Sequence, residues 1–466
     1  MNAQSLLERR LASSANEFTT PTEPTDTLVS AEKNDEDLSE EIREKLNRAF
    51  GEQIHQRANE EEFKRQMERV IYALLDEKGV KKSAMERARF ATRMLNDILG
   101  FGPLQPLIED ESVTEIMVVG PEKVYAEQQG KLTLTDTKFA SAREVQNLIN
   151  KIVGPLGRRC DESTPNVDAR LPDGSRVSAS IQPIALDGPY ITIRKFSKKG
   201  FTLDDYVRLK SMSREMAQFL EACVNGRVNI FVSGGTGSGK TTLLNCLSNY
   251  IDPRERIVTI EDSAELQLKQ PHVERYESRP ANVEGKGAIT IRDLVIYSLR
   301  KRPDRIVVGE VRGGEALEML QAMNTGHDGS LSTGHSNSPR EMMSRLETMV
   351  LMSGMELPVR AIRETIAGAV QLVVQVSRLK DGSRKITAIT EVVGMGREGA
   401  DKLGLKNFDK ESICLQDIFR FKQEGVDTQG KVNGRFVATG HRPIFLDRLQ
   451  AQGIHLDPQI FEGAEG

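Results

Sequence analysis

The chain has 466 residues, more than a single hydrophobic core normally serves, so two or more domains are expected. Hydrophobic residues make up 38% and charged residues 28%, with a mean hydropathy of −0.42, which is typical of a globular protein. The net charge of −4 and the pI near 6.0 provide no overall attraction for nucleic acid, so they disfavour nucleic-acid binding.

No stretch approaches about 18 uninterrupted apolar residues, and the N-terminus has no sustained apolar run. These patterns predict a cytoplasmic protein with neither a signal peptide nor a membrane span, so any membrane contact would go through a partner. The cysteines lack the paired spacing of a zinc site or a disulfide framework. No zinc is therefore expected, and the predicted state is four buried thiols, at Cys160, Cys223, Cys246 and Cys414.

Residues 1–37 are rich in Ser, Thr, Pro, Asp and Glu, which predicts a disordered tail. In residues 38–100 apolar side chains recur at helical spacing, as in Phe63, Met67, Ile71 and Leu75. This pattern predicts a helical module whose last helix ends at Gly100, a suitable C-terminal stop.

Residues 101–197 carry short β-type runs such as EIMVVG and KVYAEQ, separated by turn residues, and a helical pattern over 141–153. The tripeptide Pro172-Asp173-Gly174 predicts a hairpin turn. An N-terminal α/β domain is therefore expected here, followed by a charged linker over 198–207.

Residues 208–400 alternate apolar strands with helical segments, which predicts a mostly parallel sheet covered by helices. The expected fold class is therefore α/β, with a smaller α/β domain and a helical module before it. Residues 401–466 are Gly-rich, and we expect an irregular C-terminal extension there rather than a third large domain.

The segment GGTGSGKT matches the phosphate-binding pattern G-x-x-x-x-G-K-[ST], directly after the apolar run VNIFVS and before a predicted helix. Its glycines would let backbone N–H groups close around phosphates, and the helix dipole would add to the attraction. We expect Lys240 to contact the β and γ phosphates and Thr241 to bind Mg²⁺. No guanine-binding N-K-x-D string occurs, so ATP is the expected nucleotide. The predicted nucleotide-binding residues are Gly234, Gly235, Thr236, Gly237, Ser238, Gly239, Lys240, Thr241 and Thr242.

Acidic residues follow two of the predicted strands. RIVVGEVR has Gly309 where an Mg²⁺-binding Asp is common, and Glu310 comes next; RIVTI leads to Glu261 and Asp262. Ligands of open α/β sheets lie at the carboxyl ends of the strands. We therefore expect Glu261 and Glu310 to divide metal binding and polarisation of the attacking water, with the assignment left open. For Glu261 and Asp262, a solvated strand end or a helix cap is the alternative.

His335 ends the predicted strand LSTGH, where it would hydrogen-bond the γ phosphate or a carboxylate; a packed or surface histidine is the alternative. His327 is a weaker candidate of the same kind. Phosphoryl transfer also uses cationic charge, often an arginine from another element. The residues alone do not choose among Arg170, Arg176, Arg194, Arg300, Arg302 and Arg312.

Four motifs in this order resemble those of the type II/type IV secretion ATPase superfamily, whose members are RecA-like motors: GGTGSGKT, TIEDSAEL, RIVVGEVRGGEAL and STGHSNSPREMMSRLETM. Within it the chain most resembles the CpaF/TadA ATPases of tight-adherence pili, through DARLPDGSRVS, YITIRKF and LQDIFRFKQEG. It lacks the tetracysteine motif of the pilus-extension branch, and AIRETIAGAV stands where retraction motors carry an AIRAGK-like element.

The resemblance implies a homo-hexamer that hydrolyses ATP to power assembly of a tight-adherence pilus. Its partners would be inner-membrane platform proteins, and it would lie at the cytoplasmic face of the bacterial inner membrane. It also implies that Arg176 and Arg194 approach the phosphates at a domain or subunit boundary. The alternatives are a type IV secretion ATPase for effector or DNA transfer, a RecA-like motor that moves nucleic acid, and a ring that binds ATP without hydrolysing it.

Overall fold

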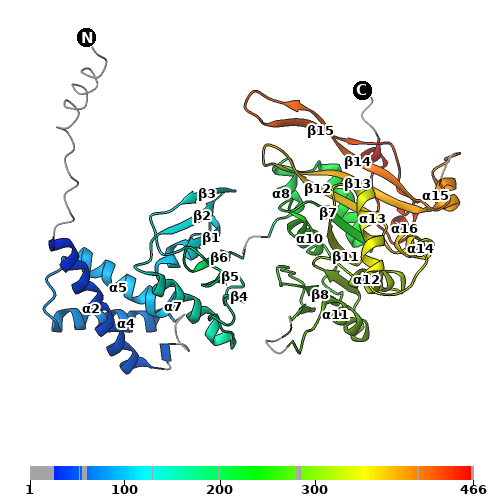
Figure 1. Cartoon of the computed structure of the whole chain (residues 1–466). Helices are drawn as coiled ribbons and strands as arrows, with labels where there is room; N and C mark the ends of the chain where they lie inside the picture. The colour runs from blue at the N-terminus through cyan, green and yellow to red at the C-terminus, as the bar shows by residue number, and fades with distance from the viewer. Residues whose placement is uncertain are drawn as a thin grey trace, which may run out of the picture. The chain divides into compact units, whose positions relative to one another are not determined.

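The computed structural model describes residues 26–51, 53–54, 60–128, 130–196, 200–279, 281, 285–406 and 409–462. The chain forms two compact units, Met1–Phe196 and Ser197–Gly466 (Figure 1). Within the described residues, no helix is both long enough and apolar enough to cross a membrane. Each unit has its own buried hydrophobic residues.

The first unit begins with three helices that share one apolar core. Phe63, Met67 and Ile71 from the middle helix are fully buried against Leu46 and Met94. The helices predicted from the spacing of apolar side chains are therefore confirmed. The last of them ends at Leu99, with Gly100 as its C-cap. These helices are α2 (Asp26–Phe50), α4 (Glu61–Glu77) and α5 (Ala84–Leu99).

The predicted disordered tail differs from the structure at its end. Residues 1–25 lie outside the described residues, whereas residues 26–37 already belong to α2. The stretch SAEKNDEDLSEE contains Ala, Glu and Lys, whose helix propensity is high, and it continues directly into the buried part of the helix.

The rest of the first unit is a six-stranded antiparallel sheet in the order β3-β2-β1-β6-β5-β4. Helix α7 (Ala142–Val153) packs its apolar face against this sheet, and together they form a second hydrophobic core of the first unit. Pro172-Asp173-Gly174 joins two paired strands, so the predicted hairpin is confirmed. The remaining elements are η1 (Gly102–Leu104), α6 (Gln105–Glu109), β1 (Val113–Val119), β2 (Lys123–Gln128), β3 (Lys131–Leu134), η2 (Gly154–Leu156), β4 (Asn166–Arg170), β5 (Arg176–Ser180) and β6 (Tyr190–Arg194).

The second unit contains a nine-stranded sheet in the order β15-β14-β13-β12-β7-β11-β10-β8-β9. The strands from β12 to β9 in that order are parallel, and β13, β14 and β15 add antiparallel pairs at one edge. The strands are β7 (Ile230–Gly234), β8 (Ile257–Glu261), β9 (Val273–Glu277), β10 (Arg305–Val308), β11 (Leu331–His335), β12 (Leu372–Arg378), β13 (Arg384–Met395), β14 (Ile413–Val426) and β15 (Val432–Ala438).

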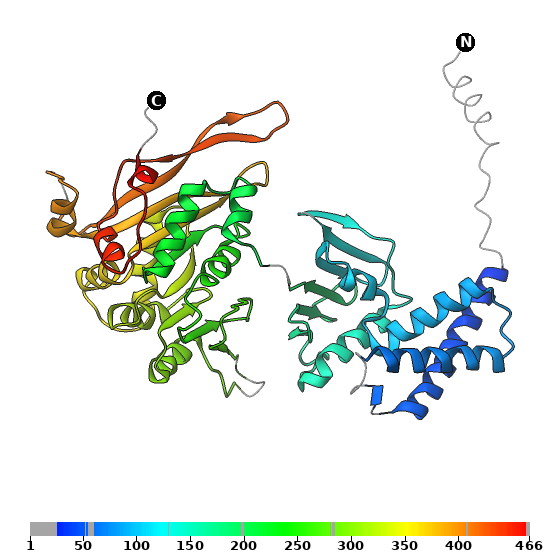
Figure 2. The ribbon, with the colours of Figure 1, turned by 180° about the vertical axis from the view of Figure 1, so that it is seen from behind.

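Helices cover both faces of this sheet (Figure 2), because the central strands are apolar on both sides. Ile230 and Val232 face one cluster with α8, α9 and α10, whereas Phe231 faces the other with α11, α12, α13 and α14. The helices are α8 (Leu203–Arg208), α9 (Arg214–Asn225), α10 (Lys240–Ser248), α11 (Ile291–Ser298), η3 (Leu299–Lys301), α12 (Glu315–Asn324), α13 (Pro339–Leu351), α14 (Val359–Ala369), α15 (Gly396–Lys402), α16 (Leu446–Ala451) and η4 (Pro458–Phe461). The expected α/β fold with a mostly parallel sheet is confirmed.

The C-terminal residues are more regular than expected. β14 and β15 extend the large sheet, and Phe461 packs at 5.6 Å from Phe219 and at 6.1 Å from Phe419. The prediction of an irregular extension was therefore wrong, because apolar residues spread over a Gly-rich stretch still complete the core of the second unit. The end of the predicted linker is also structured, since Leu203 in α8 is buried in that core.

All four cysteines are free thiols and all are buried. Burial raises the pKa of each thiol, and that of Cys246 is raised to about 12.

Candidate nucleotide site

The phosphate loop lies between β7 and α10, as its sequence predicted. Gly237 and Gly239 have φ angles of 69° and 98°, which a residue with a side chain rarely adopts. A Cβ at Gly234 would lie 2.4 Å from the carbonyl oxygen of Val376, so only glycine fits there. These features give the loop the tight curvature that a phosphate-binding loop requires.

The polar side chains of the loop have distinct surroundings. The Ser238 hydroxyl is buried and donates to the Gly235 carbonyl at 2.8 Å. Lys240 is only 7% exposed, and its Nζ donates to the same carbonyl at 3.1 Å; burial lowers the pKa of this lysine. Thr236 and Thr242 are exposed, and Thr241 is half-buried in the first turn of α10. The amino group of Lys240 therefore lies at the loop.

Glu261 ends β8 and is 2% exposed. Its Oε1 accepts hydrogen bonds from the backbone N–H groups of Glu265 at 2.8 Å and Leu266 at 3.0 Å. Its Oε2 is buried and accepts no hydrogen bond. Desolvation raises the pKa of this carboxyl group to about 7, against the effect of those two donors.

Gly309 follows β10, next to Glu261. A Cβ at position 309 would lie 2.9 Å from Glu261 Cγ, which is closer than normal contact allows, and 3.4 Å from its Cβ. The strands β8 and β10 are parallel neighbours, with Ile260 paired to Val308. Glycine stands in the strand-end position because the glutamate of the neighbouring strand occupies that space.

Glu310 lies between a histidine and an arginine rather than facing open space. Its Oε1 is 2.8 Å from His335 Nε2, and its Oε2 accepts a hydrogen bond from Arg312 at 2.6 Å. His335 Nδ1 in turn lies 3.3 Å from Lys240 Nζ. Burial, and then the charge of Lys240, lower the pKa of His335. Lysine, imidazole, carboxylate and guanidinium therefore form one continuous row.

Asp262 is a half-exposed member of the same group. Its carboxylate lies 3.5 Å from Arg312 and accepts a hydrogen bond from the Ser278 hydroxyl. It binds side chains rather than capping a helix, so it supports the position of Arg312.

The side chains at this edge fit a magnesium ion. Mg²⁺ prefers hard oxygen ligands. Glu261 Oε2 is a buried carboxylate oxygen without a hydrogen bond, and the Thr241 hydroxyl is a second oxygen on the adjoining helix. Glu310 is already in contact with a histidine and an arginine, so Glu261 is the better-suited carboxylate in this arrangement.

The predicted arginines lie in different places. In the first unit, Arg176 pairs in register with Arg170 on one side and Arg194 on the other, so three arginines form a row across β4, β5 and β6. In the second unit, Arg312 contacts Glu310 directly. Arg300 and Arg302 precede β10, at the edge opposite Glu310.

Two arginines that were not among the predicted site residues lie at the phosphate loop. Arg384 Nε donates to the Gly237 carbonyl at 3.0 Å. Arg378 pairs with Arg384 in register, and its guanidinium is 3.9 Å from where a Gly237 Cβ would be. The string RLKDGSR contained the signal, since its Asp-Gly turn predicts a hairpin with an arginine on each strand.

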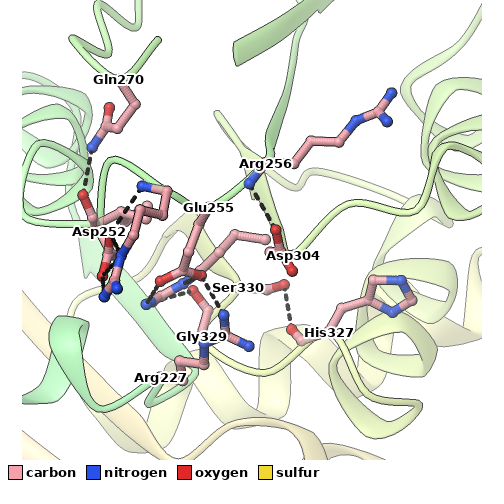
Figure 3. A network of polar contacts seen from close by, with 12 residues as sticks. Arg227, Asp252, Glu255, Arg256, Gln270, Asp304, His327, Gly329 and Ser330 are labelled. Atoms are coloured by element: carbon pink, nitrogen blue, oxygen red, sulfur yellow. Dashed lines mark hydrogen bonds and ion pairs between the residues drawn. The ribbon is translucent and has the colours of Figure 1, made fainter. Parts of the chain in front are cut away.

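His327 is not part of the site. It lies near the amino ends of the parallel strands, where its backbone carbonyl accepts from Ser330 at 2.7 Å (Figure 3). Its ring Nδ1 is 3.2 Å from the carbonyl of Ala322, so it is a packed histidine.

The fold and this site define a P-loop α/β protein with two strand-end glutamates and a histidine beside the phosphate loop. Residues 97–425 match the family model of the type II/IV secretion system proteins. The chain therefore belongs to this family of secretion ATPases, whose members use ATP.

The chain is also similar to individual proteins of secretion and conjugal transfer systems. The chain is 33% identical to the conjugal transfer protein TrbB of Rhizobium radiobacter, over 65% of this chain and 90% of that protein. It is 28% identical to the type IV secretion system protein VirB11 of Bartonella henselae, over 62% and 90%. Among solved structures, the chain is similar to the crystal structure of the VirB11 ATPase from the Brucella suis type IV secretion system in complex with sulphate. The sequence identity is 29%, the match covers 62% of this chain and 91% of that chain, and the TM-score is 0.34.

Proposed function

We propose that this protein hydrolyses ATP with Mg²⁺ at the site between β7, β8, β10 and β11, and that it acts as a motor of a secretion machine. The observation that carries the proposal is the convergence of Lys240, Glu261, Glu310 and His335 at the carboxyl edge of four adjacent strands. Such an edge binds the ligands of open α/β sheets, and transfer of a phosphoryl group needs positioning and charge stabilisation there.

In the proposed reaction, the loop N–H groups and Lys240 bind the β and γ phosphates. Lys240 then exchanges its contact with the Gly235 carbonyl for phosphate oxygens. Glu261 Oε2 and Thr241 would hold Mg²⁺, which would supply neutralisation of the phosphate charge. Glu310 orients and polarises the attacking water, while His335 and Arg312 hold this carboxylate in place.

Substitution of either glutamate tests the chemistry. Glu310→Gln should retain ATP binding and lose turnover by about 10²-fold or more, because general base catalysis contributes that much. Glu261→Gln should also retain ATP binding and lose most turnover, because it removes the carboxylate proposed to hold Mg²⁺. Steady-state ATPase assays and a nucleotide-binding titration measure the two effects. Near-normal turnover of Glu310→Gln would mean that β10 has a structural role and does not supply a catalytic group. If the wild-type protein binds ATP but shows no Mg²⁺-dependent turnover, the proposed ATPase activity is contradicted.

The relatives favour a type IV secretion or conjugal transfer machine as the system that this motor drives. In this proposal six copies form a ring at the cytoplasmic face of the inner membrane, and membrane-embedded partners of the machine bind it. Mass measurement with ATP and Mg²⁺ tests the hexamer. A strain that carries Lys240→Ala at a normal protein level tests the assignment to this machine, because the strain should lose secretion or conjugal transfer.

A tight-adherence pilus is a second candidate. It rests on the motifs DARLPDGSRVS, YITIRKF and LQDIFRFKQEG, which resemble those of the CpaF/TadA branch. The same Lys240→Ala strain separates the two systems, because loss of surface pili without loss of transfer assigns the motor to pilus assembly.

A motor that moves nucleic acid directly makes a different prediction. Double-stranded or single-stranded DNA would then stimulate the ATPase of the purified protein, and salt would weaken that stimulation. We expect no stimulation, because the chain carries a net charge of −4.

A further inference from the structure

The hairpin of β12 and β13 lies against the phosphate loop and touches it through arginine. Arg384 is the first residue of β13, and its Nε donates to the Gly237 carbonyl at 3.0 Å. The same side chain lies 3.3 Å from where a Cβ of Gly239 would be. Gly237 and Gly239 have no side chains to restrict their backbones, so a charged hydrogen bond from outside the loop restricts them instead.

The turn of this hairpin is held in one conformation. The N–H of Leu379 donates to the Ser383 carbonyl at 2.8 Å, and the N–H of Gly382 donates to the Leu379 carbonyl at 2.9 Å. Asp381 Oδ1 accepts from the Ser383 N–H at 2.9 Å and from its hydroxyl at 2.6 Å. The turn therefore places Arg384 at a fixed distance from Asp381.

Asp381 also binds the next hairpin. Its Oδ2 accepts from the backbone N–H of Val432 at 2.9 Å, at the start of β15. The hydroxyl of Ser383 and the N–H of Val432 hold the pKa of Asp381 at about 2, so this acceptor is ionised under all ordinary conditions. The β14–β15 hairpin extends beyond the helices in both views (Figure 1, Figure 2).

We propose that Arg384 is a positioning residue for the phosphate loop, and that Asp381 links this loop to the β14–β15 hairpin. The connection runs from Gly237 through Arg384 and the β12–β13 turn to Asp381 and Val432. A nucleotide that fixes the loop would thereby stabilise the projecting hairpin, and a partner that binds the hairpin would change nucleotide affinity by the same factor. The inference rests on the proposed nucleotide site.

Binding measurements on the full chain test it. Arg384→Gln should weaken the binding of ADP with Mg²⁺ by about tenfold, which is the effect of one charge-assisted hydrogen bond. The KM for ATP should rise more than kcat falls, because the lost contact positions the loop before the reaction. Asp381→Ala should also weaken ADP binding, by about threefold, because Asp381 affects the phosphate loop only through the turn and Arg384.

Amide hydrogen exchange gives a second readout that separates positioning from general stability. Exchange in residues 235–239 should become faster in both variants, and ADP should slow exchange at residues 432–438 in the wild type but less in Asp381→Ala. Arg254→Gln is the matched control, because Arg254 is an exposed arginine paired with Asp252 at the opposite edge of the sheet. It should change neither measurement.

The outcomes are separable. If Arg384→Gln binds ADP within twofold of the wild type, the role of Arg384 is overturned; if Asp381→Ala changes neither exchange nor affinity, the link to β14–β15 is overturned. Should Arg384→Gln fail to fold, Arg384→Lys keeps the charge and is measured in the same way. Lys240→Ala is the separate test of the site, because normal ADP binding by that variant contradicts the proposed function rather than this inference.

Discussion

At the residue scale, the two glutamates differ in what surrounds them. Glu261 is buried, with one oxygen held by backbone N–H groups and the other without a hydrogen bond. Glu310 is bound by Arg312 and lies against His335. A buried oxygen without a partner suits a metal ion, and a carboxylate held by an arginine beside a histidine suits a water molecule. The surroundings therefore favour Glu261 for the metal and Glu310 for the water.

The raised pKa of Glu261 makes stability depend on pH. In the unfolded chain this carboxyl titrates near 4.5, and in the folded chain its pKa is about 7. Between these values the unfolded state binds fewer protons, so the free energy of unfolding falls as pH rises, by about 3 kcal/mol in all. Urea unfolding in the presence of a chelator, at pH 5 and pH 8, should show this loss in the wild type. Glu261→Gln should show a smaller loss, and an equal loss in both proteins would contradict the assignment.

Gly309→Ala should reduce turnover without abolishing nucleotide binding. The added methyl group overlaps Glu261 Cγ, so the glutamate must move while the phosphate loop does not. We expect the ATPase rate to fall by about tenfold or more, since small displacements of catalytic groups have effects of that size. Gly425→Ala is the control, because a Cβ at Gly425 has open space around it.

Residue types and spacing were enough to predict that the glycine-rich loop, both glutamates and His335 lie at the carboxyl ends of strands, because each ends or follows an apolar strand. They were not enough for Arg384, whose importance depends on β12 lying beside β7. That pairing joins residues far apart in the chain. The sequence likewise did not show why glycine is required at position 309, because the requirement comes from the Glu261 side chain on the neighbouring strand.

At the scale of elements, the amino ends of the parallel strands are joined by a buried ionic cluster (Figure 3). Arg305, the first residue of β10, is fully buried and makes two hydrogen bonds to Glu255, at 2.8 and 2.9 Å. Its third contact is the carbonyl of Gly329, and Arg227 lies 3.1 Å from Glu255. The cluster fixes where β8, β10 and β11 begin, and so where Glu261, Glu310 and His335 lie at the other end.

Arg305→Met should therefore destabilise the second unit strongly. The change leaves Glu255 buried with Arg227 as its remaining partner, and breaking a buried pair costs about 3–5 kcal/mol. Urea unfolding measures the loss. The double variant Arg305→Met/Glu255→Leu should recover much of it, because an apolar replacement of both partners leaves no uncompensated charge. No recovery would indicate that packing, rather than charge, dominates at this position.

At the scale of the whole molecule, the chain is two units with separate cores. A fragment of residues 200–466 contains the complete nine-stranded sheet and the phosphate loop. We expect it to fold and to bind ADP with an affinity close to that of the full chain. The family resemblance implies that Arg176 and Arg194 approach the phosphates, and on that hypothesis the turnover of the fragment should be lower by about 10³-fold.

The full chain with Arg176→Gln and Arg194→Gln is the matched comparison for that fragment. Both proteins should lose turnover to a similar extent while retaining ADP binding. Full activity of the fragment would assign the cationic role to arginines of the second unit, with Arg312 foremost because it contacts Glu310.

The alternation of strands and helices was sufficient to predict the large parallel sheet, because a pattern of that kind has few stable arrangements. It did not predict that β14 and β15 complete this sheet. Their apolar residues are interrupted by charges and glycines, and they are organised by pairing with β13 and by the long-range packing of Phe419 on Phe219.

The buried thiols make the molecule suitable for optical measurements of its motion. Alkylating dyes react with thiolates, and burial keeps each native thiol protonated and shielded. A cysteine introduced at an exposed position, such as Arg435 on β15, would then be labelled selectively while Cys160, Cys223, Cys246 and Cys414 remain unchanged. Fluorescence from such a label would report the movement of the hairpin during each ATP cycle in an otherwise native chain.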